Sequence, residues 1–302
     1  MKVSRKPLVG LALGSGSARG WAHVGVIRAL EEAGIRPDLV CGTSVGAMVA
    51  AAYAAGELDR FEQWVRGMGI ADVVGFMDVT FNGGLIKGER LMDFFRSHVV
   101  DRPIGELPMP FAAVATALET GAEVWLREGS TVEAVRASLA MPAMFTPVRR
   151  DGKLLVDGAL VNPVPVSLAR AMGAEILIAV DLNSDVVGHY QHQAPQFDIH
   201  TSQVGEWLRK LHDNLDSLMP PHAPAEPPLP SMFQVVASSL NIMQVRITRS
   251  RMAGEPPDAI VAPRLGHFDL LDFHRASEAI DEGRRAVEAC LPSLQLLGLQ
   301  SA

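Results

Sequence analysis

One pentapeptide, Gly42-Thr43-Ser44-Val45-Gly46, constrains the fold more than any other stretch of the chain. It follows the apolar segment 39–41 and precedes an alanine-rich run over 47–55, which predicts a strand, a sharp turn and a helix. Glycines two positions on either side of Ser44 leave room for a strained backbone at the bend. The pattern is typical of a serine nucleophile at a helix N-terminus, although a Gly-x-Ser-x-Gly also arises by chance in a glycine-rich chain.

The bulk composition is that of a globular protein, with 302 residues of which 48% are hydrophobic and 20% charged. A formal net charge of -7 argues against nucleic-acid binding and against a polybasic membrane anchor. The two cysteines, Cys41 and Cys290, are most simply free thiols of a reducing compartment. The apolar stretch at 8–13 is too short for a signal peptide, and no stretch reaches the roughly 18 to 20 apolar residues of a spanning helix. We therefore expect a cytoplasmic protein.

The N-terminal segment has the form of a second strand–loop–helix unit. A buried strand at 8–13 is followed by the glycine-rich loop 14–20 and by a helical pattern that stops at Gly34. Backbone N–H groups of such a loop form an anion site. A dinucleotide site is the rival interpretation, but the glycine spacing is one residue too long and Asp38 opens the next strand instead of ending it. Two consecutive units place this loop and Ser44 at the same edge of a parallel sheet.

Strand and helix patterns alternate as far as residue 181, which predicts an α/β fold with a mainly parallel sheet. Further strands are expected at 111–118, 122–126, 175–180 and 259–262, and a hairpin at 148–156. Helices are expected at 58–68, 89–99, 131–139, 163–172, 233–252 and 273–297. Thr131 is the expected N-cap of the helix at 131–139, and a turn is expected at 82–84.

Residues 184–232 differ in composition and are rich in histidine and proline, which predicts an insertion or cap segment. His189 and His192 lack the further ligands of a zinc site, so loop histidines are the simpler interpretation. An amphipathic face over 204–219 either packs on its own domain or serves as a lid or docking helix beside a lipid site.

Ser44 needs a base, and two arrangements are open. The first is a triad of Ser44, Asp157 and either His267 or His274, in the chain order of one large hydrolase fold. The second uses Asp157 alone, since it follows a predicted strand end and could accept the serine proton directly. Asp157-Gly158 is also an ordinary turn sequence.

Three motifs taken together resemble the patatin-like phospholipases, and in particular the small bacterial RssA-type members related to neuropathy target esterase. They are the loop ending Ala18-Arg19-Gly20, the pentapeptide around Ser44, and Asp157-Gly158-Ala159. The resemblance runs from about Pro7 to Gly298. It implies a single domain over residues 1–302 with a three-layer α/β/α fold, and a nucleophile turn after the second strand.

The resemblance also implies the site. Ser44 is the expected nucleophile and Asp157 the expected base and acid, with no catalytic histidine, no metal and no cofactor. The remaining implied positions are the oxyanion-binding N–H groups of Gly16, Ser17 and Ala18, loop support from Arg19 and Gly20, the turn glycines Gly42 and Gly46, and the motif residues Gly158 and Ala159. The family loop reads Gly-Gly-Gly-x-Arg-Gly, whereas serine stands at positions 15 and 17 here. A position that needs φ > 0 would cost serine roughly 1 kcal/mol or more.

The implied function is hydrolysis of a phospholipid, a lysophospholipid or another fatty-acyl ester, with peripheral membrane contact and with no nucleic-acid partner. Met141, Met144, Phe145 and Leu160 are candidates for an acyl channel, and ordinary core packing is the alternative for each. Homo-oligomerisation, acyl transfer in place of hydrolysis, and a weakly active or inactive regulatory protein that binds lipid or a partner on the same fold all remain open.

Overall fold

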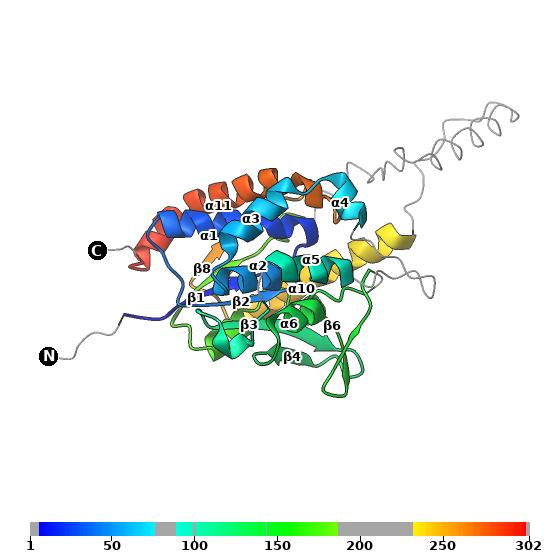
Figure 1. Cartoon of the computed structure of the whole chain (residues 1–302). Helices are drawn as coiled ribbons and strands as arrows, with labels where there is room; N and C mark the ends of the chain where they lie inside the picture. Colours follow the sequence, from blue (N-terminus) through cyan, green and yellow to red (C-terminus); the bar gives the residue numbers. More distant parts are fainter. Residues whose placement is uncertain (1–5, 76–88, 99–100, 143, 187–231, 300–302) are drawn as a thin grey trace, which may run out of the picture.

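The structure is a computed structural model, and it describes residues 6–75, 89–98, 101–142, 144–186 and 232–299 (Figure 1). The expected turn at 82–84, His189, His192 and the amphipathic segment 204–219 lie outside the described residues, as does nearly all of the proposed insertion 184–232.

Within the described residues, eight strands form one sheet in the order β5-β6-β3-β2-β1-β7-β8, with β4 paired to β3. The strands are β1 (Val9–Leu13), β2 (Leu39–Thr43), β3 (Phe111–Ala117), β4 (Glu123–Leu126), β5 (Val148–Arg150), β6 (Lys153–Asp157), β7 (Ile176–Val180) and β8 (Ala259–Val261). The pairs from β3 through β8 are parallel, whereas β4, β5 and β6 pair antiparallel. The central strands are short apolar runs, such as VGLAL in β1, because both of their faces are buried.

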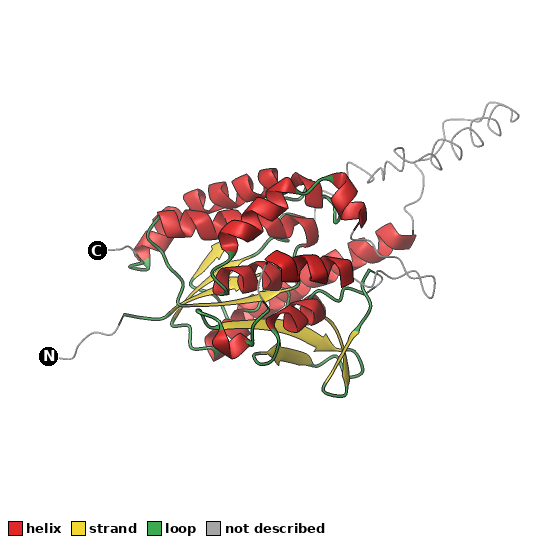
Figure 2. Cartoon of the chain, viewed as in Figure 1, coloured by secondary structure: helices red, strands yellow, loops and turns green. Residues whose placement is uncertain are grey.

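Helices cover both faces of this sheet (Figure 2). Alternate residues of β1 show the two sides: Leu11 and Leu13 belong to the larger apolar cluster, while Ala12 belongs to a second cluster. The larger cluster is covered by α1 (Ala22–Glu32), α2 (Val45–Ala54), α3 (Leu58–Gly67), α4 (Ile70–Gly75), α5 (Glu89–His98), α6 (Thr131–Ser138) and α11 (Ala276–Leu296). The second cluster is covered by α7 (Val166–Ala171) and by Met252 of α10 (Met232–Gly254). Short 3₁₀ turns are η1 (Ser17–Trp21), η2 (Ile104–Glu106), η3 (Gly158–Leu160) and η4 (Phe273–Arg275).

This architecture confirms the expected three-layer α/β/α fold, with the turn at Ser44 after the second strand. Two local predictions need correction. The N-cap of α6 is Ser130 and not Thr131, because the Ser130 hydroxyl accepts the Glu133 N–H at 3.0 Å while the Thr131 hydroxyl donates to the Arg102 carbonyl. The expected helix at 273–297 begins as the 3₁₀ turn η4 and becomes α-helical only at Ala276.

Candidate active site

The turn between β2 and α2 holds Ser44 in an unusual backbone conformation, with φ 58° and ψ −127°. Such a conformation costs of order 1–3 kcal/mol and persists only where its surroundings enforce it. A β-carbon at Gly42 would lie 2.3 Å from the Gly46 carbonyl oxygen, and one at Gly46 would lie 2.3 Å from the Leu13 carbonyl oxygen. Both positions therefore require glycine, because the backbone on either side of Ser44 is in direct contact with its neighbours.

Ser138 holds the same turn from the end of α6. Its hydroxyl accepts the Ser44 N–H at 2.8 Å and donates to the Val114 carbonyl at 2.6 Å. Both bonds are buried, so the hydroxyl connects the turn to β3 in a place that water does not reach. No sequence pattern pointed to Ser138.

Asp157 comes next to Ser44 because β2 and β6 meet end to end along one edge of β3. Strand β2 pairs with β3 as far as Val114, and β6 takes over at Ala115, which lies opposite Asp157. Strand β4 pairs with these same β3 residues from the other edge, so β2 and β6 must share an edge. The last residue of β6 is therefore placed beside the residue that follows β2.

The Ser44 hydroxyl donates directly to the Asp157 carboxylate, with Oγ and Oδ2 2.6 Å apart. The other carboxylate oxygen accepts the Ala159 N–H at 2.8 Å, and the Thr116 hydroxyl donates to the Asp157 carbonyl at 2.8 Å. Burial raises the pKa of Asp157 to about 6, although the hydrogen bonds from Ser44 and Ala159 act in the opposite direction. A carboxylate with this pKa is ionised near neutral pH and is a stronger base than an ordinary aspartate.

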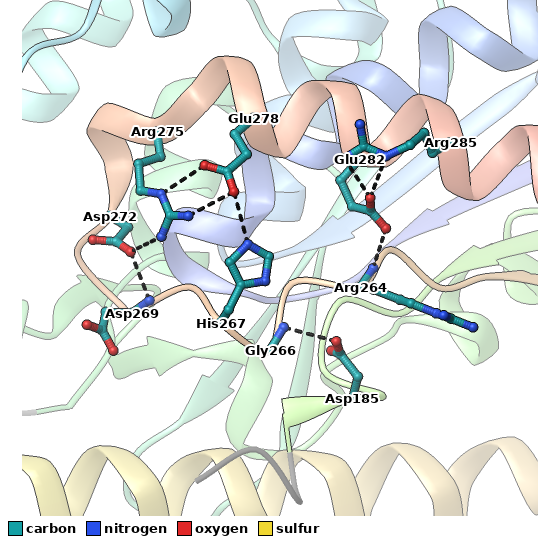
Figure 3. Close-up of polar contacts among 10 residues, drawn as sticks. All are labelled: Asp185, Arg264, Gly266, His267, Asp269, Asp272, Arg275, Glu278, Glu282 and Arg285. Carbon is teal, nitrogen blue, oxygen red and sulfur yellow. Dashed lines mark hydrogen bonds and ion pairs between the residues drawn. The ribbon is translucent and has the colours of Figure 1, made fainter. Parts of the chain in front are cut away.

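The histidines of the proposed triad lie elsewhere. His267 is exposed, and its Nε2 lies 3.0 Å from Glu278 in α11, where Arg275 also pairs with Glu278 (Figure 3). His274 belongs to η4. Since the serine and aspartate side chains bond directly, no imidazole stands between them.

His23 is fully buried, and its Nε2 lies 2.7 Å from the Gly14 carbonyl oxygen. Because a carbonyl only accepts, the ring proton is on Nε2. Burial lowers the pKa of His23 to about 4, which keeps the ring neutral. We assign it to anchoring the loop after β1.

The loop after β1 folds back on itself. Ser17 has a φ of 51°, the kind of position at which serine pays a steric cost. The buried Arg19 side chain donates from Nε to the Gly16 carbonyl at 3.1 Å, which gives it a structural role in the loop. The Ser15 carbonyl accepts a hydrogen bond from the Asn183 side-chain amide at 3.1 Å, so the loop is also fixed by the segment that follows β7.

Only two of the three expected oxyanion donors are without a partner among the described residues, namely the N–H groups of Gly16 and Ser17. The Ala18 N–H already donates to the Leu270 carbonyl at 3.3 Å, and the Ser17 hydroxyl donates to the same oxygen at 2.6 Å. An oxyanion could accept a hydrogen bond from the Ala18 N–H only if the Leu270 carbonyl moved away.

Ser44 and Ser17 open into a pocket of about 730 Å³, part of which is open to solvent. Its remaining lining is apolar and comes from η1, α2, α4, α5 and η4, and from the chain just after α3, after α6 and before η4. The lining residues are Trp21, Val45, Met48, Met68, Val73, Leu91, Leu139, Met141, Met144, Phe145, Leu271 and Phe273. Three of the four acyl-channel candidates are in this lining, and Leu160 is not. Sequence patterns did not point to Leu271 or Phe273.

The described part of the chain contains no cluster of three or more metal-binding side chains. It also contains no helix that is long and apolar enough to cross a bilayer.

Comparisons with known proteins identify the family of this chain. Residues 11–170 match the family described as patatin-like phospholipase. An uncharacterised NTE family protein of Mycobacterium tuberculosis is 31% identical, in an alignment that covers 100% of this chain and 96% of that protein. Human patatin-like phospholipase domain-containing protein 6 is 35% identical over 91% of this chain, which spans only 20% of that protein. The crystal structure of VipD from Legionella pneumophila shares the fold, with a TM-score of 0.52 at 13% identity over 94% of this chain and 67% of that chain. The chain therefore belongs to the patatin-like phospholipase family, among the relatives of the NTE proteins.

Proposed function

We propose that the protein is a serine lipid acyl hydrolase that uses a Ser44–Asp157 dyad. One observation supports this most strongly: the 2.6 Å hydrogen bond from the Ser44 hydroxyl, which lines an apolar pocket, to a buried carboxylate. Membership of the family supports lipid acyl hydrolysis in general terms.

In the proposed reaction, Asp157 accepts the Ser44 proton while Oγ attacks the ester carbonyl carbon. The Gly16 and Ser17 N–H groups stabilise the tetrahedral oxyanion, and each donor is worth about 10²–10³ in rate in comparable sites. Asp157 then protonates the leaving alkoxide. Water attacks the acyl-enzyme in the same manner, and Ser44 regains its proton when the fatty acid leaves.

The apolar pocket supports a fatty-acyl substrate, such as a phospholipid or a lysophospholipid. A long acyl chain buries its methylenes against side chains such as Met48, Leu139 and Phe273, at about 0.8 kcal/mol for each buried methylene. The two free cysteines, Cys41 and Cys290, support a reducing compartment, and we propose the cytoplasm.

The test is product analysis by mass spectrometry on a panel of phospholipids and lysophospholipids. The wild type is expected to release fatty acid from at least one lipid class, Ser44→Ala to release none, and the exposed control Ser277→Ala to match the wild type. Fatty-acid release by Ser44→Ala at the wild-type rate would contradict the proposal.

One observation favours a second function, a weakly active or inactive protein that binds lipid on the same fold. The Leu270 carbonyl accepts the Ala18 N–H, which leaves the oxyanion with two of the three expected donors. Folded wild-type protein that binds lipids of the panel saturably, yet releases no product from them, would support this alternative.

A further inference from the structure

Helix α10 (yellow in Figure 1) has one face that is fixed to the body of the protein. Its buried residues Ala237, Asn241, Gln244 and Thr248 recur at the spacing of one helical face. Gln244 accepts a hydrogen bond from the Ser15 hydroxyl at 3.2 Å, and Arg251 pairs with Glu123 of β4 at 2.8 Å. These contacts orient the helix, so its opposite face points away from the domain.

That opposite face is apolar along the first half of the helix. Val235, Val236, Ile242 and Met243 are 48%, 39%, 50% and 47% exposed. They are four of the nine large apolar side chains that are most exposed in the described part of the chain, and all four fall within 235–243. Single exposed apolar residues need no explanation, but a gathered patch indicates an interaction surface.

The second half of this face is basic. Arg246 and Arg249 are exposed and continue the stripe toward the C-terminal end of α10. The chain as a whole has a formal net charge of -7, so an anionic surface repels most of the protein and attracts only a local basic site.

The patch adjoins the candidate active site. Val236, Leu240 and Asn241 of α10 line a second pocket of about 340 Å³. Its other walls include Met141 and Met144, which also line the pocket at Ser44. A lipid that leaves a bilayer beside α10 would therefore meet a pocket that shares Met141 and Met144 with the pocket at Ser44.

We propose that the outer face of α10, formed by Val235, Val236, Ile242, Met243, Arg246 and Arg249, docks on an anionic phospholipid surface. The inference rests on the proposed function, because the docked surface supplies the acyl substrate. The apolar half enters the acyl boundary, while the arginine side chains are attracted by the net negative charge of the anionic head groups.

The test measures cosedimentation of the full chain with vesicles. The Ser44→Ala background keeps the lipids intact during the measurement. On vesicles of phosphatidylcholine and phosphatidylserine, Ile242→Asp with Met243→Asp is expected to lower the partition coefficient by about tenfold or more. The matched control is Ile260→Asp in β8, at a site of similar exposure (44%) on another element, and it is expected to bind like the parent protein.

The arginines are tested separately. Arg246→Gln and Arg249→Gln are each expected to weaken binding to phosphatidylserine-containing vesicles by about fivefold, and to leave binding to pure phosphatidylcholine unchanged. Equal losses on both vesicle types would contradict the electrostatic part of the proposal.

Further outcomes separate this proposal from its alternatives. With Ser44 present, the Ile242→Asp, Met243→Asp protein is expected to hydrolyse a soluble short-chain ester at the parent rate. Loss of vesicle binding in the control Ile260→Asp, to the same extent as in the double variant, would overturn the docking face and leave the hydrolase proposal intact.

A concentration-dependent dimer that the double variant abolishes, with vesicle binding unchanged, would assign the face to a second copy of the chain and also overturn the proposal. If the parent protein does not hydrolyse the soluble ester although vesicle binding follows the expected pattern, the hydrolase proposal fails and the docking face stands.

Discussion

Replacing Asp157 with asparagine is expected to remove ester hydrolysis and, at the same time, to stabilise the fold. Burial raises the pKa of Asp157 from about 3.8 to about 6, so the folded protein holds this proton more tightly than the unfolded chain does. The ionised carboxylate therefore destabilises the fold. This destabilisation is absent below the pKa that Asp157 has in the unfolded chain, and it grows as the pH rises from that value. It is complete above the pKa that Asp157 has in the folded protein. At about 1.4 kcal/mol per pKa unit, the cost of the buried carboxylate is about 3 kcal/mol at pH 8 and about half of that at pH 5.

Urea unfolding of the wild type and Asp157→Asn at these two pH values measures the effect. The stability advantage of the variant is expected to grow by about 1–2 kcal/mol from pH 5 to pH 8. Changes in hydrogen bonding that asparagine introduces do not depend on pH, so they cancel in this difference. An advantage that is the same at both pH values would refute the reasoning, since Asp157 would then not titrate differently in the folded and unfolded chains.

Three other predictions concern the same site. The kcat/KM for a soluble ester is expected to fall about tenfold from its plateau near pH 8 to pH 5, because the base Asp157, with its pKa of about 6, must be ionised; a flat pH–rate profile would count against it. Ser17→Gly relieves a positive φ but loses the bond to the Leu270 carbonyl, effects of about 1 kcal/mol each, so its melting temperature is expected to stay near that of the wild type and its kcat within about threefold. Ser138→Ala leaves the buried Ser44 N–H unpaired and is expected to cost about 1–3 kcal/mol in urea unfolding, whereas the control Ser277→Ala costs nothing measurable; equal stabilities would show that Ser138 does not support the turn.

The parts of the fold that depend on local pattern could be predicted from the sequence. The central strands are short apolar runs, and the glycines around Ser44 mark the turn because a β-carbon there would meet backbone. The predicted N-cap of α6 was wrong by one residue, although serine is the better N-cap and Glu133 three positions after Ser130 completes a capping-box pattern. The Ser130 hydroxyl also donates to Asp101 at 2.9 Å, a contact from 29 positions away that local sequence does not reveal.

The site was predictable only where a motif marked it. Ser44 and Asp157 each stand in a recognisable motif at a strand end, although 113 positions separate them. Ser138 and Leu270 carry no such mark, because their roles come from hydrogen bonds to residues far away in the sequence, such as Ser44 (94 positions from Ser138) and Ser17 (253 positions from Leu270). The same holds for Leu271 and Phe273, which line the pocket because η4 packs against η1, α3 and α4.

The central claim is that Asp157 alone activates Ser44 as a nucleophile, and a fluorophosphonate probe tests it most directly. Mass spectrometry of the labelled peptides is expected to locate the adduct on Ser44 in the wild type and in His267→Ala. Ser44→Ala is expected to carry no adduct, and Asp157→Asn to label more slowly than the wild type by orders of magnitude. Normal labelling of Asp157→Asn together with loss of labelling in His267→Ala would contradict the dyad.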